Sequence, residues 1–301
     1  MNIEMNRQKS SILGIGLGAV CIAFAPILVR FAQQSPSSVA FYRCLFAFFI
    51  LLPFCFKELK KLVVEKSKIF WLWAALGGLA FFLDLWVWHQ AIEYVGAGLA
   101  TVLCNTQVFV SGILGLFLLK EKLSWIWICS ACMAIFGIYL LADFHSIAVH
   151  SDNHLRGIGL GLLTAPFYSM YVFSLRQIQV SNVSVSIQAC MSAVLLLSSV
   201  FAGAMGSVEG VSFAVSGSLF LMYLALALGP QVTGWILISK NLTKVPLATS
   251  GLLLLIQPVF AFMMGIAIFG EHFSSQQLLG VVVTLAAIYM ATVWKGKKAI
   301  R

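Results

Sequence analysis

The sequence predicts an all-α polytopic membrane protein whose ten transmembrane helices form two inverted five-helix repeats. Composition is the first observation behind this prediction, because 61% of the 301 residues are hydrophobic, 10% are charged and the mean hydropathy is +0.98. Soluble globular domains carry about a quarter charged residues, so this chain could not hide its apolar surface in water. The other two observations are a succession of ten apolar runs and an internal repeat.

Each apolar run is about 20 residues long, which is the length that crosses the hydrocarbon core of a bilayer. We expect spans at residues 11–31, 37–56, 69–90, 97–119, 124–142, 157–177, 184–206, 214–236, 246–269 and 274–294. Nine runs follow the first one, so we interpret the first as a membrane span and not as a signal peptide. The short connections leave no room for a sizeable soluble domain.

The repeat relates two halves, which we take as residues 1–145 and 155–301. Residues 96–123 align with residues 246–273, so that Gln107 falls on Gln257 and Glu121 on Glu271. The pentapeptide Gly-Ile-Gly-Leu-Gly occurs at both 14–18 and 157–161, and such small residues let helices approach closely in lipid. Because five spans is an odd number, the second half enters from the opposite face, as in the inverted repeats of secondary transporters.

Positive charge is concentrated on the side that holds both termini. Of the 19 Lys and Arg residues, those on that side are Arg7, Lys9, Lys57, Lys60, Lys61, Lys66, Lys68, Lys120, Lys122, Arg176, Lys240, Lys244, Lys295, Lys297, Lys298 and Arg301. The opposite loops carry Arg156. The positive-inside rule therefore places both termini in the cytoplasm, with the chain in the cytoplasmic (inner) membrane. The net charge of +9 is then a topology signal, and we expect no nucleic-acid partner.

The sequence gives no reason to expect a cofactor or a metal. All seven cysteines fall inside apolar runs and are interpreted as small buried hydrophobes. His145, His150 and His154 share one connection, but no helical pattern brings them together around a metal. Glu121 and Glu271 end spans four and nine, where a carboxylate can cap free backbone N–H groups. A membrane-embedded enzyme would need polar catalytic clusters, and a channel would need a filter or charged rings, and neither pattern is present.

Charged groups inside the predicted spans are the first candidates for a binding site, because such groups are costly in lipid. Asp84 lies well inside span three, and Arg43 lies about two turns into span two. One interpretation is that they contact a charged or zwitterionic substrate, or that Asp84 carries a coupling proton. The other is a permanent Arg43–Asp84 pair that locks two helices together.

Uncharged polar groups near mid-membrane are the second set: Asn105 and Gln107 in span four and Gln257 in span nine. They either face a substrate or form interhelical hydrogen bonds worth roughly 1 kcal/mol each. Pro258 follows Gln257 directly and removes a backbone donor, so it can open span nine at mid-membrane. Pro26 and Pro166 could do the same in spans one and six.

Aromatic side chains would supply the wall of such a site through stacking and cation–π contacts. The candidates are Trp88, Tyr168, Tyr171 and Trp235. The alternative, which applies to Trp235 in particular, is an interfacial anchor near the end of a span.

The chain resembles the EamA-type branch of the drug/metabolite transporter superfamily. The resemblance rests on the two five-span halves, on Gln257-Pro258-Val259-Phe260 with Gly270-Glu271, and on Phe41-Tyr42-Arg43 near the start of span two. The first half is a poorer copy, since Gln107-Val108 lacks the proline. The resemblance implies a transporter of small metabolites, such as amino acids, S-adenosylmethionine, nucleotide sugars or drugs.

The function predicted from the sequence is secondary transport of a small organic metabolite, an amino acid or amino-acid derivative, by alternating access. Spans one, three, four, six, eight and nine would surround the central site. An S-adenosylmethionine carrier and an exporter of cationic drugs are the alternatives. The expected partners are the substrate, the lipid bilayer and either protons or a counter-substrate, and a monomer would suffice.

Overall fold

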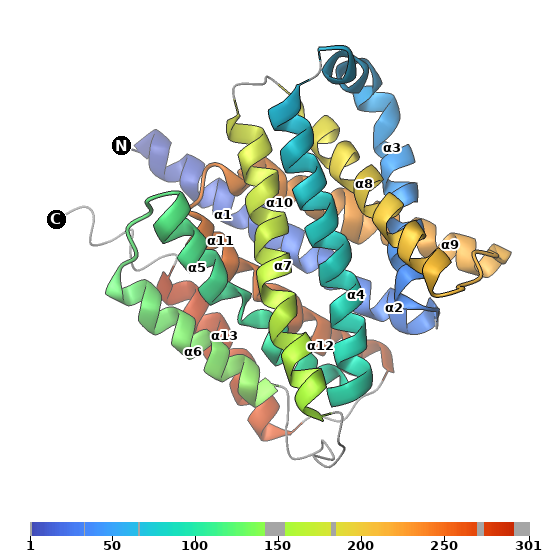
Figure 1. Ribbon diagram of the computed structural model, residues 1–301. Coiled ribbons are helices and arrows are strands. Elements are labelled where there is room, and N and C mark those ends of the chain that lie inside the picture. The colour runs from blue at the N-terminus through green and yellow to red at the C-terminus, as the bar shows by residue number, and fades with distance from the viewer. Residues whose placement is uncertain are drawn as a thin grey trace.

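The computed structural model describes residues 2–32, 34–65, 67–141, 154–181, 185–269 and 274–291 as a bundle of helices, and those ranges contain no strand (Figure 1). The helices are α1 (Asn2–Ile22), α2 (Ala25–Ala32), α3 (Pro36–Val64), α4 (Lys68–Asn105), α5 (Gln107–Leu118), α6 (Trp125–Leu141), α7 (His154–Val180), α8 (Ile187–Val208), α9 (Gly217–Leu226), the π-helix η2 (Ala227–Gly234), α10 (Trp235–Leu242), α11 (Leu247–Leu254), α12 (Ile256–Phe269) and α13 (Ser275–Tyr289).

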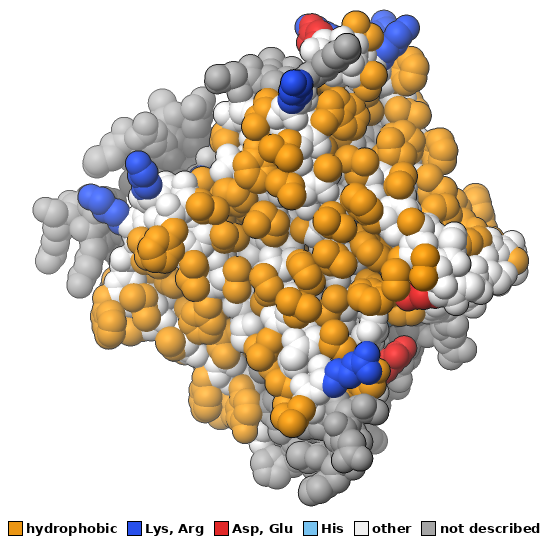
Figure 2. Space-filling view, viewed as in Figure 1, with side chains coloured by type: hydrophobic (Ala, Val, Ile, Leu, Met, Phe, Trp, Pro, Cys, Tyr) orange, Lys and Arg blue, Asp and Glu red, His pale blue; other side chains and the backbone are white. Residues whose placement is uncertain are grey.

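The described helices confirm the predicted fold class, and each predicted span has its counterpart. Seven are long and apolar enough to cross a membrane: Lys9–Val29, Pro36–Val64, Lys68–Ala91, Leu155–Val180, Ile187–Val208, Gly217–Leu242 and Leu247–Ile268. The remaining three are the shorter apolar helices Leu103–Leu118, Trp125–Leu140 and Ser275–Tyr289. Figure 2 shows the consequence at the surface, where hydrophobic side chains cover most of the visible face and charged ones lie near its margins.

Helix packing follows the two-fold relation between the halves. Span two packs on its repeat counterpart span seven (α3 on α8), and spans four and nine (α5 on α11) and five and ten (α6 on α13) do the same. Span three packs on span six (α4 on α7), and the counterpart of that pair is span eight on span one (η2 and α10 on α1). In Figure 1, α4 runs beside α7, and α6 beside α13. This is the arrangement expected when a pseudo-two-fold axis in the membrane plane relates inverted repeats.

Span one and span nine are both interrupted, as their prolines predict. A proline ring clashes with the carbonyl four residues earlier and lacks the N–H that would bond to it. For Pro26 that carbonyl belongs to Ile22, where α1 ends, and for Pro258 it belongs to Leu254, where α11 ends. The expectation for Pro166 is wrong, because α7 continues through that residue.

Span four is interrupted as well, although it has no proline at the break. Thr106 separates α4 from α5, and its hydroxyl donates to the carbonyl of Leu103 at 2.6 Å. The Thr106 N–H also bonds to Leu103, three residues back, and Leu255 bonds to Leu252 in the same way in span nine. The breaks therefore occupy equivalent places in the two repeats, with different chemical causes.

Close backbone contact fixes η2 against α1. A Cβ added to Gly18 would lie 2.6 Å from the carbonyl oxygen of Gly234, and one added to Gly234 would lie 2.7 Å from Ile22. The first Gly-Ile-Gly-Leu-Gly segment thus serves the helix packing expected of it.

Candidate functional site

The centre of the bundle holds a cluster of polar and aromatic side chains drawn from both halves. We call Arg43, Phe81, Asp84, Tyr168, Tyr171, Gln231, Trp235 and Gln257 the central cluster. Arg43 comes from α3 and Asp84 from α4, while the second half contributes through α7, η2, α10 and α12. Six of the nine predicted site residues are thus joined by Phe81 and Gln231, which the sequence analysis did not select.

Arg43 is 4% exposed and binds a neutral partner. Its Nε and Nη2 both donate to Oε1 of Gln231, at 3.2 and 2.8 Å, and its guanidinium carbon lies 5.7 Å from the centre of the Phe81 ring. Gln231 is fully buried, so this hydrogen bond joins the first half to the second across the core. Arg43 therefore lies in the core, and its hydrogen-bond partner is an amide.

Asp84 is 6% exposed, and among the described residues it has neither a hydrogen bond nor an ion pair. It interacts electrostatically with Arg43, Tyr168 and Tyr171, without an Arg43–Asp84 ion pair between these two described residues. The alternative of a permanent helix-locking pair is therefore not what the structure contains. A buried carboxylate without a partner is costly, and each such group in a native fold calls for an explanation.

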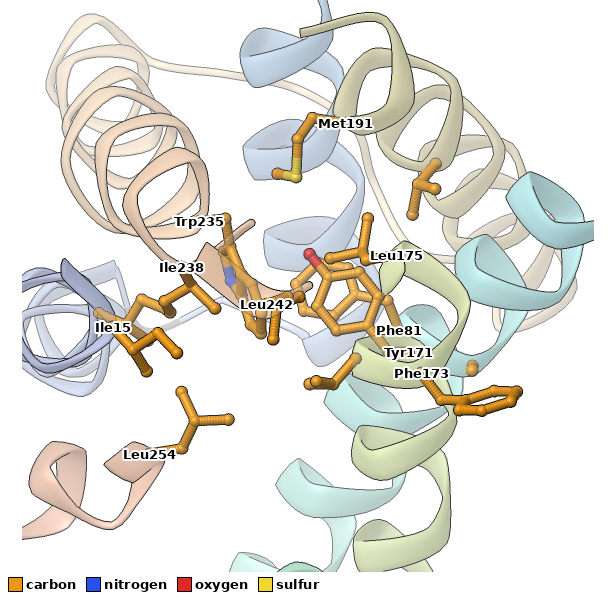
Figure 3. Close-up of a cluster of buried hydrophobic side chains, with 14 of the residues drawn as sticks. Ile15, Phe81, Tyr171, Phe173, Leu175, Met191, Trp235, Ile238, Leu242 and Leu254 are labelled. Atoms are coloured by element: carbon orange, nitrogen blue, oxygen red, sulfur yellow. The ribbon is translucent and has the colours of Figure 1, made fainter. Parts of the chain in front are cut away.

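Aromatic rings pack tightly around these charges. Tyr171 stacks on Phe81 with ring centres 4.4 Å apart, and Trp235 meets Tyr171 edge-on at 4.5 Å (Figure 3). Tyr168 lies 6.0 Å from Trp235. Trp235 is 1% exposed, so its interpretation as an interfacial anchor is wrong.

Gln257 and Gln107, which occupy equivalent positions in the repeat, have different surroundings. The half-buried Gln257 donates from Nε2 to the hydroxyl of Tyr168 at 2.9 Å, inside the central cluster. The buried Gln107 donates to the backbone carbonyl of Gly251 at 2.9 Å and accepts from Ser111 at 3.0 Å. Nε2 of Gln107 thus joins α5 to α11, and Oε1 is bonded within α5, so the structural alternative raised for Gln107 is what the structure contains.

The two remaining predicted site residues, Trp88 and Asn105, lie on α4, the helix that carries Asp84. Asn105 is the last residue of α4, is 9% exposed and adjoins the break at Thr106. Trp88 is half-buried and packs edge-on against His89, with ring centres 5.2 Å apart. His89 itself binds the carbonyl of Leu85 through Nδ1 at 2.7 Å.

Two carboxylates join the helices away from the centre. Glu121 accepts from the backbone N–H groups of Leu247 and Ala248, at 2.8 and 3.3 Å, and lies 3.4 Å from Arg176. It therefore caps α11 of the other half and not the helix that follows it. Its repeat counterpart Glu271 lies outside the described residues, as do His145 and His150.

Glu209 plays the corresponding role at the end of α8. It accepts from Ser37 at 2.6 Å and from the indole N–H of Trp86 at 2.7 Å. Nearby, the Tyr42 hydroxyl donates to the carbonyl of Phe213, and the Tyr42 ring stacks on Tyr223 at 4.9 Å. Hydrogen bonds between the halves therefore lie on either side of the central cluster.

Gln231 is the residue that reasoning from the sequence missed. It follows Pro230 inside an apolar run, so the argument from polar groups within spans applied to it as much as to Gln107. Its place in a π-helix, a form frequent at functional sites, could not be predicted from a period of 3.6 residues.

Comparison with known proteins gives a consistent picture. A model of the EamA-like transporter family matches residues 9–142 and 155–293. A protein of Clostridium kluyveri named as an uncharacterized transporter is 24% identical over 263 residues, covering 85% of this chain and 83% of its own. A crystal structure with 15% sequence identity superposes with a TM-score of 0.76 over 95% of this chain and 97% of that one, which shows a shared fold.

Proposed function

The chain belongs to the EamA-like transporter family and is a multi-pass membrane transporter, and on this basis we propose that it is a secondary carrier of a small organic metabolite. The proposed substrate is an amino acid or an amino-acid derivative, moved across the cytoplasmic membrane by alternating access. Residues 1–145 and 155–301 are the two repeat units, both termini are cytoplasmic, and one copy of the chain suffices. The family and its transporter-named relative point to a carrier and not to an enzyme.

One observation carries the substrate class. Arg43, a basic residue, and Asp84, an acidic one, are buried in the same cluster, yet these two described residues are not joined in an ion pair. A zwitterion has a carboxylate for the cation and an ammonium group for the anion, so it would satisfy both at once. The rings of Tyr168, Tyr171 and Trp235 would then pack against its side chain.

A second candidate substrate is S-adenosylmethionine. It carries the same amino-acid end together with a sulfonium cation and an adenine ring. The aromatic rings around Asp84 favour it, because faces of Tyr and Trp attract cations and stack on bases. A proton or a counter-substrate accompanies transport, with Asp84 as the coupling candidate.

The test is counterflow by purified protein in liposomes, preceded by a thermal-shift screen against amino acids, S-adenosylmethionine and cationic drugs. A ligand at about 100 times its Kd should add roughly 2.7 kcal/mol of stability. We expect one amino-acid-like compound to stabilise the wild type, to show trans-stimulation, and to lose both effects in Asp84→Asn. An equal response of Asp84→Asn would remove Asp84 from the binding site, and stabilisation by bulky cations alone would replace the metabolite by a drug.

A further inference from the structure

The Arg43–Gln231 contact joins the two halves at the point where the central cluster has unused hydrogen-bond donors. Oε1 of Gln231 accepts from two guanidinium nitrogens, and Nε2 of the same amide, about 2.2 Å from Oε1 by covalent geometry, has no partner among the described residues. The hydroxyl of the fully buried Tyr171 is also without a partner in the described part of the chain.

These unused groups share one chemical character. Nε2 of Gln231 is a donor and the Tyr171 hydroxyl can donate, and the nearby Arg43 guanidinium, which already donates to Gln231, is a donor as well. Tyr171 and Arg43 lie against the same ring, Phe81, so the donors gather in one place. Buried donors without acceptors are costly, and a carboxylate offers two oxygens with about four acceptor positions in the geometry that a guanidinium binds best.

The backbone around Gln231 explains how this residue reaches Arg43. Gln231 lies in the π-helix η2, between α9 and α10, and the contact of Gly18 with Gly234 holds the end of η2 against α1. A groove of about 340 Å³ lined by Phe24, Leu28, Pro230 and their neighbours borders η2.

We propose that Arg43, Gln231 and Tyr171 form a carboxylate-binding subsite, in which the amide oxygen of Gln231 occupies the carboxylate position while the carrier is empty. This inference rests on the proposed function and specifies how one end of its substrate is held. The substrate carboxylate displaces Oε1 from the guanidinium, and the freed amide donates from Nε2 to the incoming oxygen. Binding therefore breaks one link between the halves, which ties recognition of the carboxylate to their movement.

Gln231→Glu tests the subsite without any ligand, because it places a fixed carboxylate where the amide oxygen lies. The matched control is Gln276→Glu, a half-buried glutamine in the first turn of α13. We expect the empty Gln231→Glu protein to melt about 3 °C above the wild type through a charge-assisted pair with Arg43. The control should melt within about 1 °C of the wild type. A melting temperature of Gln231→Glu at or below that of the wild type would show that the site does not accept a carboxylate.

The second measurement uses probes that differ in one group: L-phenylalanine and L-methionine against L-phenylalaninamide and L-methioninamide. We expect the acids, and not the amides, to stabilise the wild type, and Gln231→Glu to lose at least about tenfold in apparent affinity for them. Equal responses to acids and amides would overturn the subsite but leave the carrier in place. A raised melting temperature of Gln231→Glu without counterflow of any probe would instead retain the subsite and contradict the proposed substrate class.

Discussion

Two arginines of this protein, the half-buried Arg176 and the buried Arg43, are held in opposite ways. Arg176 lies 3.4 Å from the carboxylate of Glu121 and donates to the carbonyl of Val245 at 2.8 Å. Arg43 is more deeply buried, yet its hydrogen bonds go to the neutral amide of Gln231, while Asp84 nearby lacks an ion-pair partner among the described residues. In the first arrangement the positive charge of Arg176 is matched by the carboxylate of Glu121. In the second, Arg43 binds an amide and forms no ion pair with Asp84.

The difference indicates that the contacts of Arg176 stabilise the fold and that the cluster around Arg43 serves function. A cation matched by a carboxylate and two capped N–H groups stabilises the fold, whereas an incomplete buried cluster costs free energy. Such a cost is tolerated at sites that a ligand completes. Variants that affect one arginine and spare the other can therefore separate stability from transport.

The largest effect on stability is expected from Glu121→Gln. This change leaves the half-buried Arg176 without its counter-ion and removes the charge that caps α11, so we expect a loss of about 3 kcal/mol in the free energy of unfolding. Differential scanning fluorimetry in detergent measures it. Glu65→Gln is the control, because the Lys61–Glu65 pair is exposed, with 72% and 55% of the two side chains accessible, and should matter little. Equal melting of the two variants would mean that the Glu121 contacts are not structural.

Arg43→Met should give the reverse pattern. Removing a buried charge saves its desolvation cost and leaves the Gln231 oxygen without a donor, and these two effects roughly cancel. We therefore expect melting within about 2 °C of the wild type and a loss of at least about tenfold in counterflow. A large fall in melting temperature would assign Arg43 to the fold, and normal counterflow would remove it from the site.

The smallest effects are expected from the two repeat-related glutamines. Gln107→Ala loses the buried hydrogen bond from α5 to the Gly251 carbonyl in α11, so it should cost roughly 1 kcal/mol of stability and leave the half-saturation constant unchanged. Gln257→Ala frees the Tyr168 hydroxyl inside the central cluster, so it should raise the half-saturation constant with little change in melting. Parallel melting curves and transport assays would decide, and an exchange of the two phenotypes would contradict these assignments.

Much of the fold could be predicted because apolar length and repeats are properties of the sequence itself. The two proline breaks were predictable because proline removes an identifiable backbone bond. The break at Thr106 was not, since a threonine bonded to Leu103 looks like any other helical threonine until the structure is seen. Likewise Pro166 lies within a continuous α7, where packing against α4 outweighs local preference.

The charged residues of the candidate site could be predicted from the sequence, but the hydrogen bond between Arg43 and Gln231 could not. Burial of Arg43, Asp84, Tyr171 and Trp235 agrees with their selection from the sequence. That Arg43 would meet Gln231 depends on how η2 is wound and on how two distant spans cross, and neither depends on local sequence alone. The polar residue that pairs across the halves is therefore the kind of residue that sequence reasoning overlooks.

We expect the unlike breaks in spans four and nine to affect the rates of the proposed transport. A break made by Pro258 is permanent, whereas the one at Thr106 can close into a regular helix once the hydroxyl releases Leu103. In the proposed alternating-access cycle, the two repeats would exchange roles with hinges of unequal stiffness. We therefore expect different half-saturation constants on the two faces of the membrane, measurable in vesicles of opposite orientation. A carrier without an energy source must still obey the Haldane relation, so its maximal rates must differ in proportion and leave no net flux at equal concentrations.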